Sequence, residues 1–230
     1  MEPASPALDA KLAALAKIYG YYRDLVADQK WACATGCAVC CTCNVTLTTL
    51  EGVFLYRELD ALNPRFLVQL QARARRPRYQ PRLSLNDFAW RCAKGQPTPE
   101  EHHDPDWGEC PLLDQDLCAL YAKRPFGCRG MHSFQRCRRK GQASLDEFQL
   151  TLNHLFSQVI EHLDCPGWTG NLTDILLHLH RSRQAPADSP QKEAFPLAAN
   201  QPARVLMIPP DQRQTAGPIV AKLQRIITLG

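Results

Sequence analysis

The sequence lacks a long apolar run, a large net charge, and any repeated or low-complexity segment. No segment offers the roughly 18 uninterrupted apolar residues that a membrane-spanning helix needs. Charged residues such as Glu2, Asp9 and Lys11 interrupt the first twenty residues, so the apolar stretch typical of a secretory signal is missing. We therefore expect a cytoplasmic chain with no membrane partner.

The composition is otherwise ordinary for a globular protein, apart from its cysteines. The chain has 230 residues, of which 45% are hydrophobic and 22% charged, and its net charge is +4. This length is sufficient for a buried core without support from a metal or disulfides. The chain has 11 cysteines, an odd number, and disulfides do not persist in a reducing cytoplasm. We therefore interpret the cysteines as metal ligands or redox thiols.

The hydrophobic periodicity predicts a mainly α fold, a small helical domain with irregular cysteine-rich metal-binding loops. Ser144 and Glu147 have the spacing of a capping box, and Asn171 is a candidate helix cap. The pair Ser5-Pro6 marks a helix start. The expected helices cover 6–26, 49–62, 65–76, 84–94, 145–163, 172–179 and 218–228, with a short strand at 205–208. Prolines between 184 and 202 indicate a linker. The predicted division is a cysteine-cluster metal-binding domain (1–183), a Pro-rich linker (184–202) and a C-terminal extension (203–230).

The densest group of cysteines lies in the segment 31–50, which has no charged side chain. It runs Cys33-x3-Cys37-x2-Cys40-Cys41-x-Cys43. A C-x2-C step lets two thiolates of one turn face the same centre, as in zinc knuckles and iron–sulfur loops. Adjacent cysteines tend to point apart. Either one of Cys40 and Cys41 is therefore not a ligand, or the site is large or double.

A second group of cysteines lies farther along the chain, where an acidic stretch (100–116) gives way to a basic one (123–140). Its intervals are too long for a knuckle and suit ligands donated by loops around a centre that the first group begins. Arg124 and Arg129 would offset the thiolate charge through hydrogen bonds to sulfur. The predicted metal ligands of both groups are Cys33, Cys37, Cys40, Cys41, Cys110, Cys118 and Cys128.

At these residues the chain resembles the YkgJ-type cysteine-cluster family, also called the CxxCxxCC or zinc- or iron-chelating family. The likeness rests on Cys33, Cys37 and Cys40-Cys41, followed in order by CPLLD, CALY, RP and CR, within residues 31–130. Three residues separate the first pair of cysteines here, whereas the family name implies two. The resemblance implies metal binding. The family also looks related to flagellin lysine methylases, which are associated with an iron–sulfur cluster.

The kind and number of centres stay open. An iron–sulfur cluster, most simply 4Fe–4S, and zinc or iron ions all suit thiolate ligands. The spacing of Cys33, Cys37 and Cys40 also matches the radical S-adenosylmethionine motif, although that motif belongs in a barrel of strands and helices. The plain alternative is a set of buried thiols without metal.

The remaining cysteines lie outside the family pattern. Cys43 and Cys137 adjoin the two groups and are candidate additional metal ligands. Together with the other seven they would suffice for two four-thiolate sites. Cys92 and Cys165 suit core packing.

Three functions fit these observations. The first is a cytoplasmic metal-binding protein that holds an iron–sulfur cluster or an iron/zinc centre. The second is a structural zinc module that contacts RNA or a protein partner through the basic stretch 123–140. The third is an iron–sulfur-dependent, methylase-like enzyme. No catalytic acid, base or nucleophile can be named from the sequence.

Overall fold

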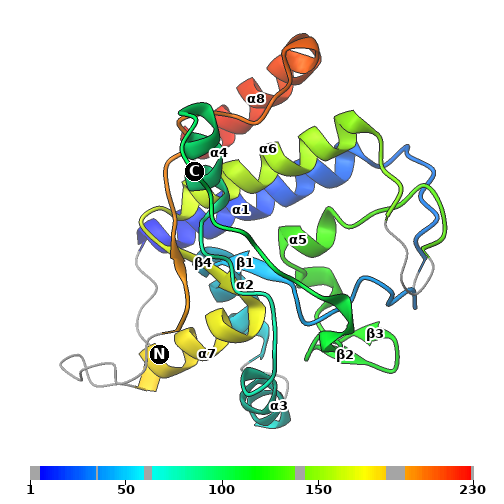
Figure 1. Ribbon diagram of the computed structural model, residues 1–230, viewed down its shortest axis with the longest axis vertical. Coiled ribbons are helices and arrows are strands. Elements are labelled where there is room, and N and C mark those ends of the chain that lie inside the picture. Colours follow the sequence, from blue (N-terminus) through cyan, green and yellow to red (C-terminus); the bar gives the residue numbers. More distant parts are fainter. Residues whose placement is uncertain (1–5, 35, 60–63, 138–142, 185–194, 229–230) are drawn as a thin grey trace.

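The computed structural model describes residues 6–34, 36–59, 64–137, 143–184 and 195–228. This part of the chain is mainly helical, which confirms the mainly α part of the predicted fold class (Figure 1). The helices are α1 (Pro6–Leu25), α2 (Thr49–Leu59), α3 (Pro64–Ala74), α4 (Leu85–Ala93), α5 (Phe126–Arg129), α6 (Glu147–Asp164), α7 (Leu172–Gln184) and α8 (Arg213–Thr228). The strands are β1 (Thr46–Thr48), β2 (Leu113–Asp114), β3 (Leu117–Cys118), β4 (Trp168–Asn171) and β5 (Ala198–Ala199). Short 3-10 helices cover Pro105–Trp107, Tyr121–Lys123 and Pro210–Gln212.

A small antiparallel sheet with the strand order β1-β4-β5 lies between two sets of helices (Figure 1). Leu47 of β1 lies opposite Gly170 of β4, and Thr169 lies opposite Ala198 of β5. A Cβ at Gly170 would lie 2.4 Å from a terminal methyl of Leu197, so a larger residue here would displace that side chain. The sheet thereby joins segments that are far apart in the sequence.

Two hydrophobic clusters fill the space around this sheet. The first combines α1, α6 and α8 and includes the fully buried Leu15 and Leu223. The second combines α2, α3 and α7 around Leu55 and Ile175. Helix α2 contributes to both clusters, because Leu50 belongs to the first. The two sets of helices are therefore packed through a shared element.

The start of α6 differs from the sequence prediction. Its cap is Asp146, whose carboxylate accepts a hydrogen bond from the Gln149 backbone nitrogen at 2.6 Å. The predicted capping box of Ser144 and Glu147 is therefore wrong. The backbone of Ser144 is instead bonded to a distant segment, since its nitrogen donates to Ser133 Oγ at 2.9 Å and its oxygen accepts from the Phe134 nitrogen at 2.8 Å.

The segment 205–208, predicted as a strand, has no strand partner among the described residues. The side chain of Gln158 takes the place of one. Its amide nitrogen donates to the Val205 oxygen at 2.8 Å, and its amide oxygen accepts from the Met207 nitrogen at 2.8 Å. The strand prediction is wrong because a buried side chain satisfies this backbone.

The C-terminal helix begins earlier than predicted. Helix α8 starts at Arg213 and contains Pro218, the residue at which the sequence places its start. Its Ile219 and Leu223 lie in the first hydrophobic cluster. Residues 185–194 of the predicted linker lie outside the described residues, whereas 198–199 form β5. None of the described helices combines the length and hydropathy needed to cross a bilayer.

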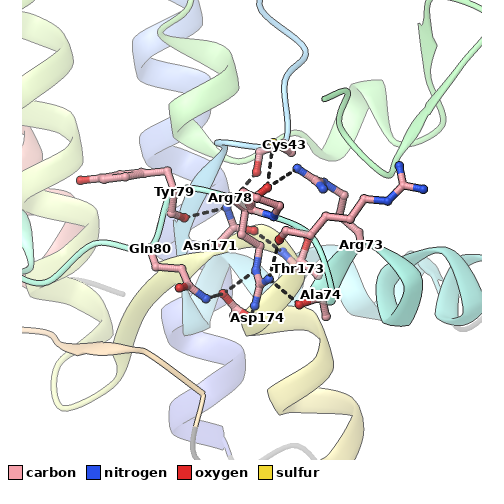
Figure 2. A network of polar contacts seen from close by, with 11 residues as sticks. Cys43, Arg73, Ala74, Arg78, Tyr79, Gln80, Asn171, Thr173 and Asp174 are labelled. Atoms are coloured by element: carbon pink, nitrogen blue, oxygen red, sulfur yellow. Dashed lines mark hydrogen bonds and ion pairs between the residues drawn. The ribbon is translucent and has the colours of Figure 1, made fainter. Parts of the chain in front are cut away.

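A buried polar network fixes the segment that follows α3 (Figure 2). Asp174 is fully buried near the start of α7 and forms an ion pair with Arg78, whose side chain is 10% exposed. Gln80 also donates to Asp174, at 3.1 Å. The amide of Asn171 donates to the backbone oxygens of Cys43 and Tyr79, at 2.8 and 2.9 Å. The network therefore ties α7 to the segment that carries the first cysteines.

We expect Asp174→Asn to lower the free energy of unfolding by about 3 kcal/mol or more, because it leaves the buried Arg78 charge uncompensated. The matched control is Asp9→Asn, which removes an exposed ion pair with Arg57 and should cost less than about 1 kcal/mol. Urea unfolding followed by circular dichroism measures both. Equal losses in the two variants would contradict this role of Asp174.

Candidate metal centre

The first cysteine group lies on the connection between α1 and β1, and its end pairs with the segment before β2. The Cys110 nitrogen donates to the Cys41 oxygen at 2.9 Å, and the Cys43 nitrogen donates to the Gly108 oxygen at 2.8 Å. An isolated antiparallel bridge joins Thr42 and Glu109 between them. The segments around Cys41 and Cys110, which are about 70 residues apart in the sequence, therefore lie side by side. This pairing brings the two cysteine groups together.

A tight hairpin brings Cys118 to the same place. Strands β2 and β3 pair with Leu113 opposite Cys118. Gln115 and Asp116 form the turn with positive φ angles of 46° and 61°, which is the backbone that a two-residue hairpin favours. The Leu113 nitrogen also donates to the Cys110 oxygen at 3.0 Å. Cys110 and Cys118 both pack, partly buried, against the second hydrophobic cluster.

Helix α5 supplies the fourth cysteine, Cys128. Phe126 is 3% exposed, and its nitrogen donates to Glu51 Oε1 at 2.6 Å. A Cβ on Gly127 would lie 3.1 Å from the Thr46 oxygen, so α5 sits tightly against β1. These contacts anchor α5 to the core, and Cys128 follows in its single turn.

Four thiols from these three segments lie close enough to influence one another, and we call them the inner thiol group: Cys41, Cys110, Cys118 and Cys128. Burial and, to a lesser extent, negative charge on Cys118 raise the pKa of Cys110 to about 11. Burial also raises the pKa of Cys128, and negative charge on Cys110 and Cys118 adds to this. A hydrogen bond with Cys40 lowers the pKa of Cys41. Burial and negative charge on Cys128, Cys110 and Cys118 act in the opposite direction. Every pair within the group interacts.

The other predicted ligands in the first group lie apart from this set. Cys33, Cys37 and Cys40 are exposed. Burial is the largest cause of the raised pKa of Cys33. Negative charge on Cys37, Cys40 and Cys137 raises it further. Cys40 lies at the border, because its thiol is hydrogen-bonded to that of Cys41. Its charge also raises the pKa of Cys128, so Cys40 connects the exposed thiols to the inner thiol group.

The remaining cysteines have different environments. Cys43 is 2% exposed, and its Sγ faces the Pro77 oxygen at 3.9 Å and Asn44 Oδ1 at 3.5 Å. Cys165 is half-buried at the end of α6. Cys92 is exposed, so its predicted core position is wrong. The buried face of α4 is made by Asn86 and Ala89 instead.

The two predicted charge-offsetting arginines have separate roles. Arg124 stacks on Tyr121 at 3.6 Å, and its charge lowers the pKa of both Cys40 and Cys128 against larger opposing effects. Arg129 donates to the backbone oxygens of Arg124 and Ala122, each at 2.7 Å. Arg124 therefore acts on the thiols through its charge, whereas Arg129 holds the turn before α5.

The basic stretch 123–140 is partly engaged within the molecule. Lys123 forms an ion pair with Glu58 at 3.1 Å, and Arg129 binds backbone oxygens as described above. Arg136 is exposed, and residues 138–140 lie outside the described residues. The histidines of the acidic stretch, His102 and His103, are exposed, as expected for a solvated loop.

Glu51 supports this site and is absent from the residues that the sequence singles out. Its carboxylate accepts from the Thr48 nitrogen at 2.9 Å, while Thr48 Oγ1 accepts from the Glu51 nitrogen at 3.3 Å. This is a capping box, and the sequence signal that could have identified it is Thr48-x-x-Glu51. The same carboxylate binds Phe126 and so positions α5.

The donor chemistry of the inner thiol group fits a thiophilic metal. All eleven cysteines are free thiols, and the group combines four of them. Within the part of the chain that the structure describes, no three Cys, His, Asp or Glu side chains are arranged so that they could hold one metal ion as they stand. The thiols are thus neighbours that do not converge on a single point.

Comparison with known proteins adds nothing to this description, because no protein-family model, curated protein or solved structure matches the chain.

In the metal-free, reduced protein we expect Cys41 to be alkylated first and Cys128 last within the inner thiol group, because the thiolate is the reactive form. Timed iodoacetamide labelling at pH 7.5, with sites assigned by tandem mass spectrometry, measures the order. Labelling of Cys110 should rise by about tenfold per pH unit below its pKa of about 11.

The control for this order is the same reaction in guanidinium chloride, where all the thiols should react alike. If folded protein also modified Cys41 and Cys128 at equal rates, the described environments of these thiols would be incorrect.

Proposed function

We propose that the protein is a metalloprotein whose inner thiol group holds a four-iron, four-sulfur cluster. The observation that carries this proposal is the mutual proximity of Cys41, Cys110, Cys118 and Cys128, which three separate segments supply. Four cysteine thiolates are the usual ligand set of such a cluster.

A four-iron cluster and a single zinc ion require different spacings of four thiolates. Four sulfurs at about 2.3 Å from one zinc ion lie about 3.8 Å from one another. In a four-iron cluster each thiolate binds a different iron, so the sulfurs stand farther apart. The distances between the four sulfurs in the metal-bound protein therefore distinguish the two centres.

The charge balance also supports a bound metal. Burial and mutual repulsion disfavour ionised Cys110 and Cys128 in the metal-free protein. A bound cation reverses this preference, because metal coordination makes the thiolate the stable form. Arg124 supplies a positive charge that acts on Cys128. Such a cluster supplies one-electron transfer or an iron that accepts a ligand, and the protein residues here hold it and offset its charge.

The zinc module that binds RNA or a protein partner receives less support. It requires a free basic surface in the stretch 123–140, and Lys123 and Arg129 are used in internal contacts. The methylase-like enzyme stays a prediction, for which turnover of S-adenosylmethionine is the test.

The experiment is anaerobic purification with analysis of iron, acid-labile sulfide and zinc, together with the visible and electron paramagnetic resonance spectra. We expect a brown protein that contains iron and sulfide in equal amounts. A colourless protein with zinc at the inner thiol group would overturn the cluster assignment.

We expect Cys110→Ser or Cys128→Ser to abolish the iron and sulfide signal of the inner centre, because each removes one thiolate from the set. The matched controls are Cys92→Ser and Cys165→Ser, which lie outside it and should leave iron and sulfide unchanged. Circular dichroism establishes that each variant is folded. Retention of the full iron content in both Cys110→Ser and Cys128→Ser would contradict the assignment.

A further inference from the structure

A cavity of about 350 Å³ lies between α4, α5, α6, β1 and the segment that precedes α4. Its volume is within the range of small-molecule sites, about 300 to 1,000 Å³, whose walls are mostly apolar. The apolar side chains of this wall are Leu47, Leu83, Leu85, Phe88, Phe126 and Ile160. A wall of this kind suits an organic ligand better than a hydrated metal ion.

The polar part of the wall is acidic. Glu51 and Glu161 line the cavity and are only 4% and 2% exposed, and the exposed Glu101 lines it as well. Among the described residues, no lysine, arginine or histidine lines this cavity. Three carboxylates therefore face a space whose wall supplies no positive charge.

Neutral donors hold the carboxylate of Glu161. Its Oε2 accepts from the Asn86 nitrogen at 2.8 Å, and its Oε1 accepts from the Gln201 nitrogen at 2.8 Å. Backbone N–H donors favour the ionised form of a carboxylate. None of the ion pairs found among the described residues includes Glu161. These contacts fix the position of Glu161 and leave its charge without a counterion.

The second buried carboxylate has a different environment. The charge of Arg129 interacts with Glu51, but Arg129 does not line the cavity. At the rim, burial and the negative charge of Glu101 raise the pKa of Tyr79 to about 12, so this phenol stays neutral at pH 7. With Phe88 and Phe126, Tyr79 adds aromatic side chains to the wall, and aromatic rings attract both other rings and cations.

We propose that this cavity binds a small organic amine that has an aromatic body and no carboxylate. The positive charge would be placed near Glu161, where low solvent access strengthens the attraction. The body would contact the apolar and aromatic wall. A carboxylate on the ligand is disfavoured, because the wall repels it and supplies no basic partner. The site lies outside the inner thiol group, and the proposal holds whether that group binds a metal or not.

The test compares three probes that share a phenyl ring and differ in charge, by isothermal titration calorimetry with the unaltered full chain at pH 7. Phenethylamine is cationic, phenylalanine carries an added carboxylate, and 3-phenylpropionate is anionic. We expect phenethylamine to bind at least about tenfold more tightly than phenylalanine, because the cavity repels the carboxylate. 3-Phenylpropionate should show no binding.

Two variants locate the bound probe. Ser157 is half-buried and lines the cavity from α6, so Ser157→Phe should fill the cavity and abolish phenethylamine binding. Glu161→Gln should weaken that binding by about tenfold or more, because it removes the buried charge. Glu147→Gln, an exposed position at the start of the same helix, is the matched control and should leave binding unchanged.

The outcomes decide the proposal without reference to iron or sulfide content. Absence of phenethylamine binding, or equal affinity for all three probes, would overturn it. Unchanged binding in both Ser157→Phe and Glu161→Gln would place the probe elsewhere and would also overturn it. Circular dichroism reports whether the variants are folded. If Glu161→Gln does not fold, the three probes on the unaltered protein and the Ser157→Phe result still decide the question.

Discussion

The thiol loops depend on the buried carboxylate of Glu51. It is 4% exposed and accepts hydrogen bonds from the Tyr19 hydroxyl at 2.7 Å, the Thr48 nitrogen at 2.9 Å and the Phe126 nitrogen at 2.6 Å. A buried carboxylate is costly unless such donors satisfy it, so the three donors are held together. They belong to α1, β1 and α5. Because Cys128 lies two residues after Phe126, Glu51 helps to position the inner thiol group through Phe126.

The hydrophobic clusters also position segments that carry the thiols. Trp31 packs against the first cluster and positions Cys33 through its stacking contacts. Cys110 and Cys118 pack directly against the second cluster. The thiols are therefore gathered by contacts that do not require a metal, and the remaining cost is electrostatic. Neutral thiols tolerate one another, whereas thiolates repel, so ionisation of the inner group is unfavourable until a cation binds.

The helices were predictable where their signals are local. Helix α1 begins at Pro6, as the Ser-Pro pair indicates, and Ser84 and Asn171 cap α4 and α7. The cap of α6 was not predictable in this way, because the backbone of Ser144 is hydrogen-bonded to Ser133, eleven residues earlier in the chain. Likewise, the strand expected at 205–208 fails because a buried glutamine from α6 satisfies its backbone. Hydrophobic periodicity reports which face of an element is buried, but not which partner buries it.

The sequence by itself determined the mainly helical class and the density of cysteines that makes metal binding the leading hypothesis, because composition and short spacings are local properties. Only the tertiary structure decided which thiols are neighbours. The pairing of Cys41 with Cys110 and the stacking of Trp31 on Phe134 join residues far apart in the chain. Spacing alone left these neighbours open, because they arise from long-range backbone pairing and side-chain packing.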